Sequence, residues 1–146
     1  TRQVSSAASD VYKRQMNHHS FSKDRLIQVE KNINSLNNAL CNGDFDEFIK
    51  ITELEALTLH AMMMTSDPYY LLIKPNTLNI INEIWNFRQS TSSKVCFTLD
   101  AGANIHLLYS KNEFRQIQSL IENNLIQYCQ NNEFINDQVG NGPNKL

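Results

Sequence analysis

Apolar residues recur every three or four positions along the first half of the chain, which is the spacing of amphipathic helices. The first such stretch predicts a helix over residues 22–41, and Gly43 follows as a residue suited to end it. The apolar stripe of this helix consists of Leu26, Val29, Ile33, Leu36 and Leu40. A stripe of this kind is the face by which an amphipathic helix usually packs.

Two further helices are predicted downstream. Asp44 is a helix-capping residue, and Glu47 three positions later resembles the second half of a capping box. This second helix ends before Pro68, because proline disfavours helix in the residue that precedes it. After residues 69–73, an apolar run whose pattern fits more than one structure, a third helix is expected over about residues 77–89.

The pattern then changes from helical to extended. Residues 94–99 (KVCFTL) are rich in β-forming side chains and almost wholly apolar, so they predict a largely buried strand. Residues 105–109 predict a second strand, and the short turn of residues 101–104 between them contains a glycine. Two such strands around a short glycine-containing loop predict a β-hairpin.

The order of elements predicts an α+β fold, with helices packed on one face of a small antiparallel sheet. Ser110 and Glu113 suggest a capping box before a fourth helix, and residues 139–143 suggest a loop or a final edge strand. A two-stranded sheet is thin, and isolated hairpins are marginally stable. The sheet is therefore expected to be incomplete, with a further strand supplied by the tail or by upstream chain.

Composition excludes several classes of protein. The 146 residues are 41% hydrophobic and 19% charged, which fits one globular domain. The formal charge of −2 gives no basic excess for nucleic acid, and no apolar run is long enough to span a membrane. Three widely spaced cysteines, Cys41, Cys96 and Cys129, support neither a disulfide framework nor a zinc site. A reduced, cytoplasmic protein is predicted.

Residues 1–15 (TRQVSSAASDVYKRQ) differ from the rest of the chain. They show no sustained hydrophobic period and no helix cap, and they resemble translated adapter sequence at the end of a shotgun open reading frame. We therefore expect a non-native segment at 1–15 and a domain at 16–146. Without the segment, the domain carries 10 basic and 14 acidic groups, a formal charge of −4.

The sharpest chemical candidate is Asp100, which ends an apolar strand and opens a turn of small residues. A carboxylate at the rim of a core could act as a general base or orient a hydroxyl group. Burial would raise its pKa, whereas hydrogen bonds from the turn amides would lower it. The alternative is structural, an aspartate that caps its own turn. The local pattern alone favours this structural alternative.

Other polar residues are weaker candidates. His60 lies in an apolar helix, where a hydrogen-bonded core histidine is commoner than a catalytic one. Glu53 and Glu55 are two positions apart on a helix and cannot face each other, which suggests solvated side chains. His18 and His19 have no third ligand at a suitable spacing, so no metal site is expected.

Several motifs in order resemble one enzyme family. Residues 97–104 (FTLDAGAN) are similar to the FTxDAGxN signature of diphosphomevalonate decarboxylases, members of the GHMP kinase superfamily. Residues 44–48, the Leu-His-Ala at 59–61, residues 68–71 and the VGNGP at 139–143 also resemble family motifs in order and rough spacing. The resemblance covers about residues 16–146. It implies the C-terminal domain of a GHMP-type enzyme.

The resemblance implies an activity for the parent protein. The family converts mevalonate 5-diphosphate to isopentenyl diphosphate in isoprenoid biosynthesis, with ATP and Mg²⁺, and releases CO₂. Asp100 matches the catalytic aspartate of the family. The substrate-adjacent turn comprises Ala101, Gly102, Ala103 and Asn104. Ala103 stands where the family usually has proline, a change expected to loosen the turn slightly.

The same resemblance places the residues that bind ATP, Mg²⁺ and the diphosphate mainly upstream of this sequence. The chain alone is therefore expected to be inactive, although its parent is a carboxy-lyase that forms a homodimer and binds a small-molecule substrate. Two alternatives stay open. One is a related mevalonate 3-kinase, and the other is a non-catalytic α+β interaction module.

Overall fold

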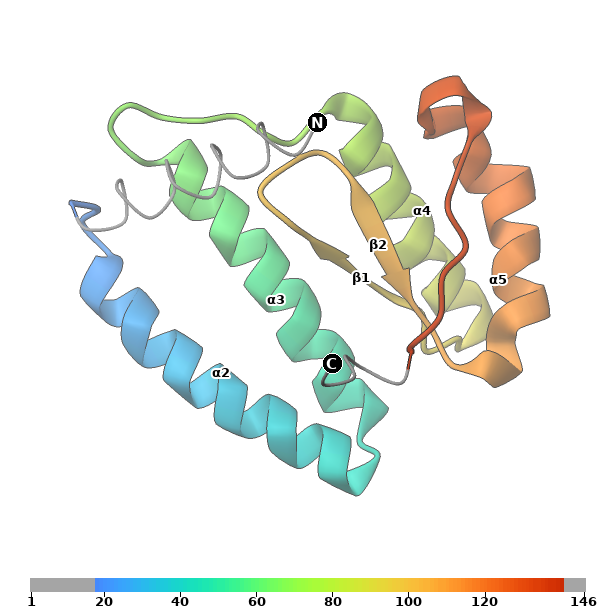
Figure 1. The fold of residues 1–146 in the computed structure, drawn as a ribbon, viewed down its shortest axis with the longest axis horizontal. Coiled ribbons are helices and arrows are strands. Elements are labelled where there is room, and N and C mark those ends of the chain that lie inside the picture. Colours follow the sequence, from blue (N-terminus) through green and yellow to red (C-terminus); the bar gives the residue numbers. More distant parts are fainter. Residues whose placement is uncertain (1–17, 141–146) are drawn as a thin grey trace, which may run out of the picture.

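The computed structural model describes residues 18–140 (Figure 1). The main elements are α2 (Ser22–Asn42), α3 (Phe45–Met64), α4 (Pro75–Thr91), β1 (Cys96–Leu99), β2 (Ile105–Leu108) and α5 (Phe114–Leu120). Short helical turns flank α5 at Lys111–Glu113, Ile121–Leu125, Ile126–Tyr128 and Gln130–Asn132. Within these residues α3 lies between α2 and the hairpin, while α4 and α5 lie on the other side (Figure 1). The predicted α+β class is confirmed.

Local signals end and begin the first helices. Gly43 follows α2 with φ of +67°, and its amide donates to the carbonyls of Ala39 and Leu40. The Asp44 side chain then accepts a hydrogen bond of 3.1 Å from the amide of Glu47. Both assignments from the sequence are confirmed, because each depends on residues only a few positions apart.

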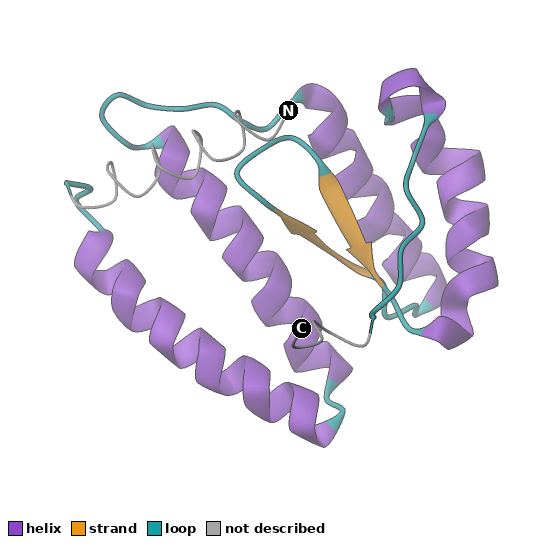
Figure 2. Cartoon of the chain, in the orientation of Figure 1, coloured by secondary structure: helices purple, strands orange, loops and turns teal. Residues whose placement is uncertain are grey.

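The predicted hairpin is also confirmed. Strands β1 and β2 pair antiparallel, with Phe97 opposite Leu107 and Leu99 opposite Ile105 (Figure 2). Phe97 is fully buried in a core that combines side chains from α3, α4, the hairpin and the α5 region. The other core members include Ala56, Ile81, Ile84, Val95, Leu99, Ile117, Leu120, Ile121 and Leu125. The hairpin is thus anchored by its apolar face.

Helix α2 packs along α3 by a face that matches the apolar pattern only in part, since Val29 and Leu36 are half-buried. Its predicted stripe is largely exposed, with Leu26 at 72%, Ile33 at 53% and Leu40 at 60%. The buried positions of α2 are instead Arg25 and Ala39. The periodicity therefore predicts the helix correctly, but the face that packs on α3 also includes Arg25, which bonds to Glu55.

The region after the hairpin differs from the expected capped helix. Ser110 makes no capping hydrogen bond with its side chain. The Glu113 carboxylate instead accepts bonds from the Ser93 hydroxyl at 2.7 Å and from the Lys94 amide at 3.0 Å. The predicted capping box is wrong because Glu113 ties the start of α5 to the chain before β1, which is distant in sequence.

The polar tail forms no strand within the described part of the chain. Residues 133–140 are irregular, and Val139 is fully exposed. The loop alternative fits residues 139 and 140, while positions 141–143 of the predicted motif and the segment 1–15 lie outside the described residues. Among residues 18–140, no helix combines the length and apolar character needed to cross a membrane.

Candidate active site

Asp100 stands directly after the last residue of β1. Its neighbour Leu99 is buried, whereas the Asp100 side chain is 93% exposed. The turn is closed by the amide of Gly102, which donates to the Asp100 carbonyl at 2.7 Å. Among residues 18–140 the structure gives no hydrogen bond from a turn amide to the carboxylate. The side chain therefore does not cap its own turn, and its oxygens are open to a ligand.

Two other polar side chains share the Asp100 face of the hairpin. Side chains alternate across a strand, so Thr98 and Asp100 point to the same face. His106 lies opposite Thr98 in the antiparallel register, and its Nε2 is 3.7 Å from Asp100 Oδ2. Both members of this pair are largely exposed, so the pair contributes little to stability. It places an imidazole beside the candidate carboxylate.

Side chains from two helices form hydrogen bonds with the backbone of the turn. His60 of α3 lies with Nε2 3.0 Å from the Asp100 carbonyl oxygen, and Thr77 of α4 donates its hydroxyl to the Ala103 carbonyl at 2.8 Å. Their exposed fractions are 1% and 3%. Burial lowers the pKa of His60, which favours the neutral imidazole. The interpretation of His60 as a hydrogen-bonded core residue is confirmed, yet this residue also touches the candidate site.

Glu53 is buried, contrary to the expectation of a solvated side chain. Its carboxylate accepts bonds from the Arg88 guanidinium at 2.5 and 3.1 Å and from Trp85 Nε1 at 3.1 Å. It also lies 3.4 Å from the Phe97 amide in β1. One carboxylate of α3 thus connects α4 with the strand that carries Asp100.

Glu55 is half-buried against α2 and is also not simply solvated. Arg25 donates to its two oxygens at 2.9 and 2.5 Å, and Asn32 donates at 2.5 Å. The hydrogen bond from Arg25 is the main reason that the pKa of Glu55 is lowered. The two-residue spacing does keep Glu53 and Glu55 apart, but each faces a different helix. Sequence spacing gives no signal for such distant partners.

The cysteines offer no nucleophile near the turn. Cys96 is buried in β1, where burial, followed by the negative charge of Glu53, raises the pKa of its thiol to about 12. Cys41 is exposed and Cys129 is partly buried, and neither forms a disulfide. A thiolate at Cys96 is therefore strongly disfavoured at neutral pH.

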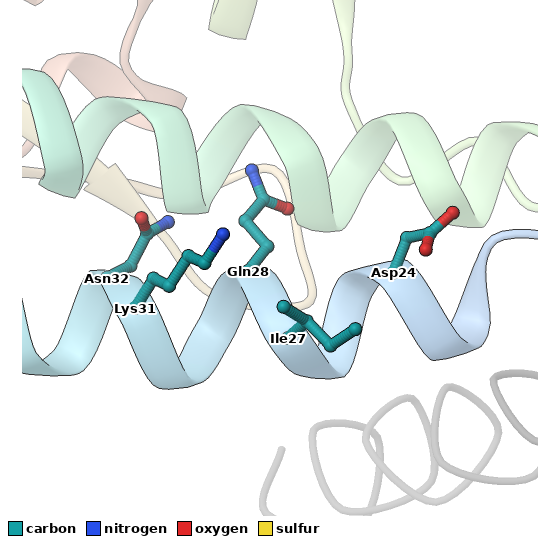
Figure 3. Close-up of a pocket in the computed structure, with 5 residues that line it drawn as sticks. All are labelled: Asp24, Ile27, Gln28, Lys31 and Asn32. Carbon is teal, nitrogen blue, oxygen red and sulfur yellow. The ribbon is translucent and has the colours of Figure 1, made fainter.

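Two hollows on the described surface lie away from the turn. Figure 3 shows one that is lined entirely by α2, with Asp24, Ile27, Gln28, Lys31 and Asn32. Another lies between α4 and the α5 region, beside Phe87 and Leu120. Within residues 18–140, no three His, Cys, Asp or Glu side chains are placed to hold a metal ion. The turn thus presents the exposed Asp100 carboxylate beside His106.

Helices packed on an open hairpin, with the exposed Asp100 carboxylate directly after its first strand, define a small α+β domain. The chain belongs to the family described as the mevalonate 5-diphosphate decarboxylase C-terminal domain, whose model matches residues 2–145. The resemblance found in the sequence is thereby confirmed. The matched range includes most of residues 1–15, and the boundary at residue 16 stays a prediction.

Similar proteins agree with this assignment. The chain is 24% identical over 97 residues to a phosphomevalonate decarboxylase of Haloferax volcanii, covering 66% of the chain and 30% of the relative. The mevalonate diphosphate decarboxylase of Legionella pneumophila has a TM-score of 0.74 at 28% identity, over 80% of the chain and 37% of that structure.

A second solved structure shares the fold. This structure, of the mevalonate diphosphate decarboxylase from Enterococcus faecalis, has a TM-score of 0.72 at 23% identity. The match covers 78% of the chain and 36% of that structure. The chain thus spans about a third of the length of these relatives. Its similarity in fold is to the C-terminal domain of longer proteins.

Proposed function

We propose that the chain is the C-terminal domain of an ATP-dependent decarboxylase that converts mevalonate 5-diphosphate to isopentenyl diphosphate. The observation that carries this proposal is the exposed carboxylate of Asp100 at the tip of the hairpin, within the part of the chain that matches the family. An exposed carboxylate on a supported turn can meet a hydroxyl group of a bound substrate.

In this proposal Asp100 acts on the tertiary 3-hydroxyl group. Its carboxylate accepts or orients the hydroxyl proton while the hydroxyl oxygen bonds to the γ-phosphorus of ATP and ADP leaves. The C–O bond then breaks and phosphate departs. The electrons of the bond to the carboxylate form the alkene, and CO₂ is released. Phosphorylation is needed because hydroxide is a poor leaving group.

ATP and Mg²⁺ are the cofactors of this proposal. One solved structure of the family contains mevalonate diphosphate (MVAPP), the ATP analogue AMPPCP and magnesium. This complex supports ATP and Mg²⁺ as cofactors. Phosphoryl transfer depends mainly on positioning and on charge stabilisation by metal and amides. The residues that perform this task are proposed to lie upstream of the sequence, as is the diphosphate site, so the chain alone is proposed to be inactive. The full-length protein is proposed to be a homodimer.

One relative favours a second substrate. The Haloferax volcanii protein is named a phosphomevalonate decarboxylase, and a substrate with one phosphate group would need the same proton acceptor at its 3-hydroxyl. The residues that distinguish a monophosphate from a diphosphate would belong to the proposed upstream site. Both substrates therefore belong in the assay.

The proposal is tested in the full-length protein with Asp100→Asn. Loss of a positioned proton acceptor should lower kcat about 10²–10⁴-fold, because this is the usual contribution of such a group. Asp137→Asn, which changes an exposed aspartate of the tail, is the matched control and should retain activity. Product analysis decides the reaction: alkene with CO₂ supports the decarboxylase, whereas a stable 3-phosphate supports the 3-kinase alternative. Unchanged turnover in Asp100→Asn would contradict a catalytic Asp100.

A further inference from the structure

We propose that His60 and Thr77 are positioning residues, which hold the two ends of the turn at residues 100–104 and thereby direct the Asp100 carboxylate toward the substrate. The inference rests on the proposed function, since it assigns the support on which that carboxylate depends. It concerns two side chains that do not themselves touch the substrate.

The first support is the bond from α3 to the start of the turn. His60 Nε2 lies 3.0 Å from the Asp100 carbonyl oxygen, which can only accept a hydrogen bond. Nε2 therefore carries a proton and donates it to this carbonyl. Because the ring is 1% exposed, water does not compete for this bond.

The second support is the bond from α4 to the end of the turn. Thr77 lies in the first turn of this helix, where its hydroxyl accepts from the Lys74 amide at 3.3 Å and donates to the Ala103 carbonyl at 2.8 Å. Both roles of the hydroxyl are thus used, so its orientation is defined. The start of α4 and the end of the turn are held at one point.

These two bonds matter because they hold the turn to two helices, in addition to the bond from the Gly102 amide to the Asp100 carbonyl within the turn. Ala101, Gly102 and Ala103 have small side chains, and the Asp100 side chain is 93% exposed. The direction of the carboxylate therefore depends on the backbone of the turn, together with the neighbouring His106 at 3.7 Å. A displacement of about 1 Å in a catalytic group can lower a rate by about 10²-fold.

The test uses two pairs of variants in the full-length native protein that contains residues 18–140. His60→Leu and Thr77→Val remove each hydrogen bond with similar volume, whereas His60→Gln and Thr77→Ser retain a donor. Ser93→Ala is the matched control. It removes a buried hydroxyl before β1, at the opposite end of the strand from the turn. kcat, KM for ATP and hydrogen exchange of residues 97–104 are measured for each variant.

His60→Leu and Thr77→Val should lower kcat about 10- to 100-fold, leave KM for ATP unchanged and speed exchange in the turn. The donor-retaining variants should stay within about threefold of the parent, and Ser93→Ala should leave kcat unchanged. If His60→Leu does not fold, Thr77→Val with Thr77→Ser provides the same comparison.

Three results separate this inference from the proposed function. If His60→Leu and Thr77→Val fold and keep the wild-type kcat and the wild-type hydrogen exchange of residues 97–104, the positioning role is overturned. Equal losses in a donor-retaining variant and its donor-removing partner would also overturn it, because the hydrogen bond would then not be the cause. Faster hydrogen exchange in the turn of the donor-removing variants, together with unchanged turnover in Asp100→Asn, would overturn the proposed function. The support of the turn by His60 and Thr77 would then still stand.

Discussion

Glu53 and His60 lie on one helix and have similar burial, but they stabilise the site in different ways. The Glu53 carboxylate pairs with the Arg88 guanidinium, whereas burial lowers the pKa of His60. Both contact β1 or the turn that follows it, at the Phe97 amide and the Asp100 carbonyl. The position of the candidate carboxylate therefore depends on polar groups inside the domain.

Replacement of Glu53 by alanine should be strongly destabilising. The change leaves the Arg88 guanidinium partly buried without its carboxylate, and it removes acceptors for Trp85 and Phe97. We expect a loss of about 3 kcal/mol in the free energy of unfolding, measured by chemical denaturation. Glu47→Ala, which breaks an exposed pair with Lys50 on the same helix, should cost no more than about 0.5 kcal/mol. Equal losses would contradict the buried network.

His60 should make stability depend on pH. Its pKa is lowered in the folded chain, so the unfolded chain binds the proton more readily and is favoured as the pH falls below about 6.5. Unfolding midpoints between about pH 5 and pH 7.5 should fall with acidity in the parent and fall less in His60→Gln. The lowered pKa of Glu55 acts in the same direction, but only as the pH falls below its ordinary value of 4.5. Identical pH profiles for parent and variant would contradict a neutral buried His60.

At the scale of elements, the helix ends follow from residues close together and the packing faces do not. Gly43 and Asp44 end one helix and begin the next through bonds within a few positions. The apolar stripe of α2, by contrast, is exposed at Leu26, Ile33 and Leu40. The contact with α3 includes the bond between Arg25 and Glu55, which joins residues thirty positions apart.

Two glycines should respond differently to the same substitution. An added Cβ meets no atom within 4 Å at either Gly43 or Gly102, but only Gly43 has a positive φ, at +67°. Gly43→Ala should therefore cost about 1 kcal/mol, while Gly102→Ala should be neutral or slightly stabilising. Thermal unfolding of the two variants measures the difference. A larger loss in Gly102→Ala would contradict the backbone geometry of the turn.

At the scale of the whole molecule, the domain presents the exposed Asp100 carboxylate, and we propose that the residues that bind the phosphate groups lie upstream of it. The match covers only 30% to 37% of the length of these relatives, which supports our proposal that upstream sequence completes the active site. The 146-residue chain should therefore show no turnover of mevalonate diphosphate with ATP and Mg²⁺, measured by release of CO₂. The full-length protein is the positive control, and turnover by the chain alone would contradict this division of the site.

The sequence by itself determined the helices that begin or end on local signals, the hairpin, the α+β class and the family. It also singled out Asp100 and its turn through the FTLDAGAN motif, and the role of Asp100 stays a proposal. The predictions of the helices, the hairpin and the fold class succeed because capping, turn formation and alternation depend on neighbours within a few positions. The family motifs likewise lie in continuous stretches of chain.

Only the tertiary structure decided what surrounds those elements. In the structure Glu53 is buried against Arg88, and most of the apolar stripe of α2 is exposed. The Glu113 side chain bonds to Ser93 and does not form the predicted cap. The tertiary structure also brought His60 and Thr77 beneath residues 100–104. Each of these contacts joins positions well separated along the chain, so their energies depend on packing geometry that no local pattern contains.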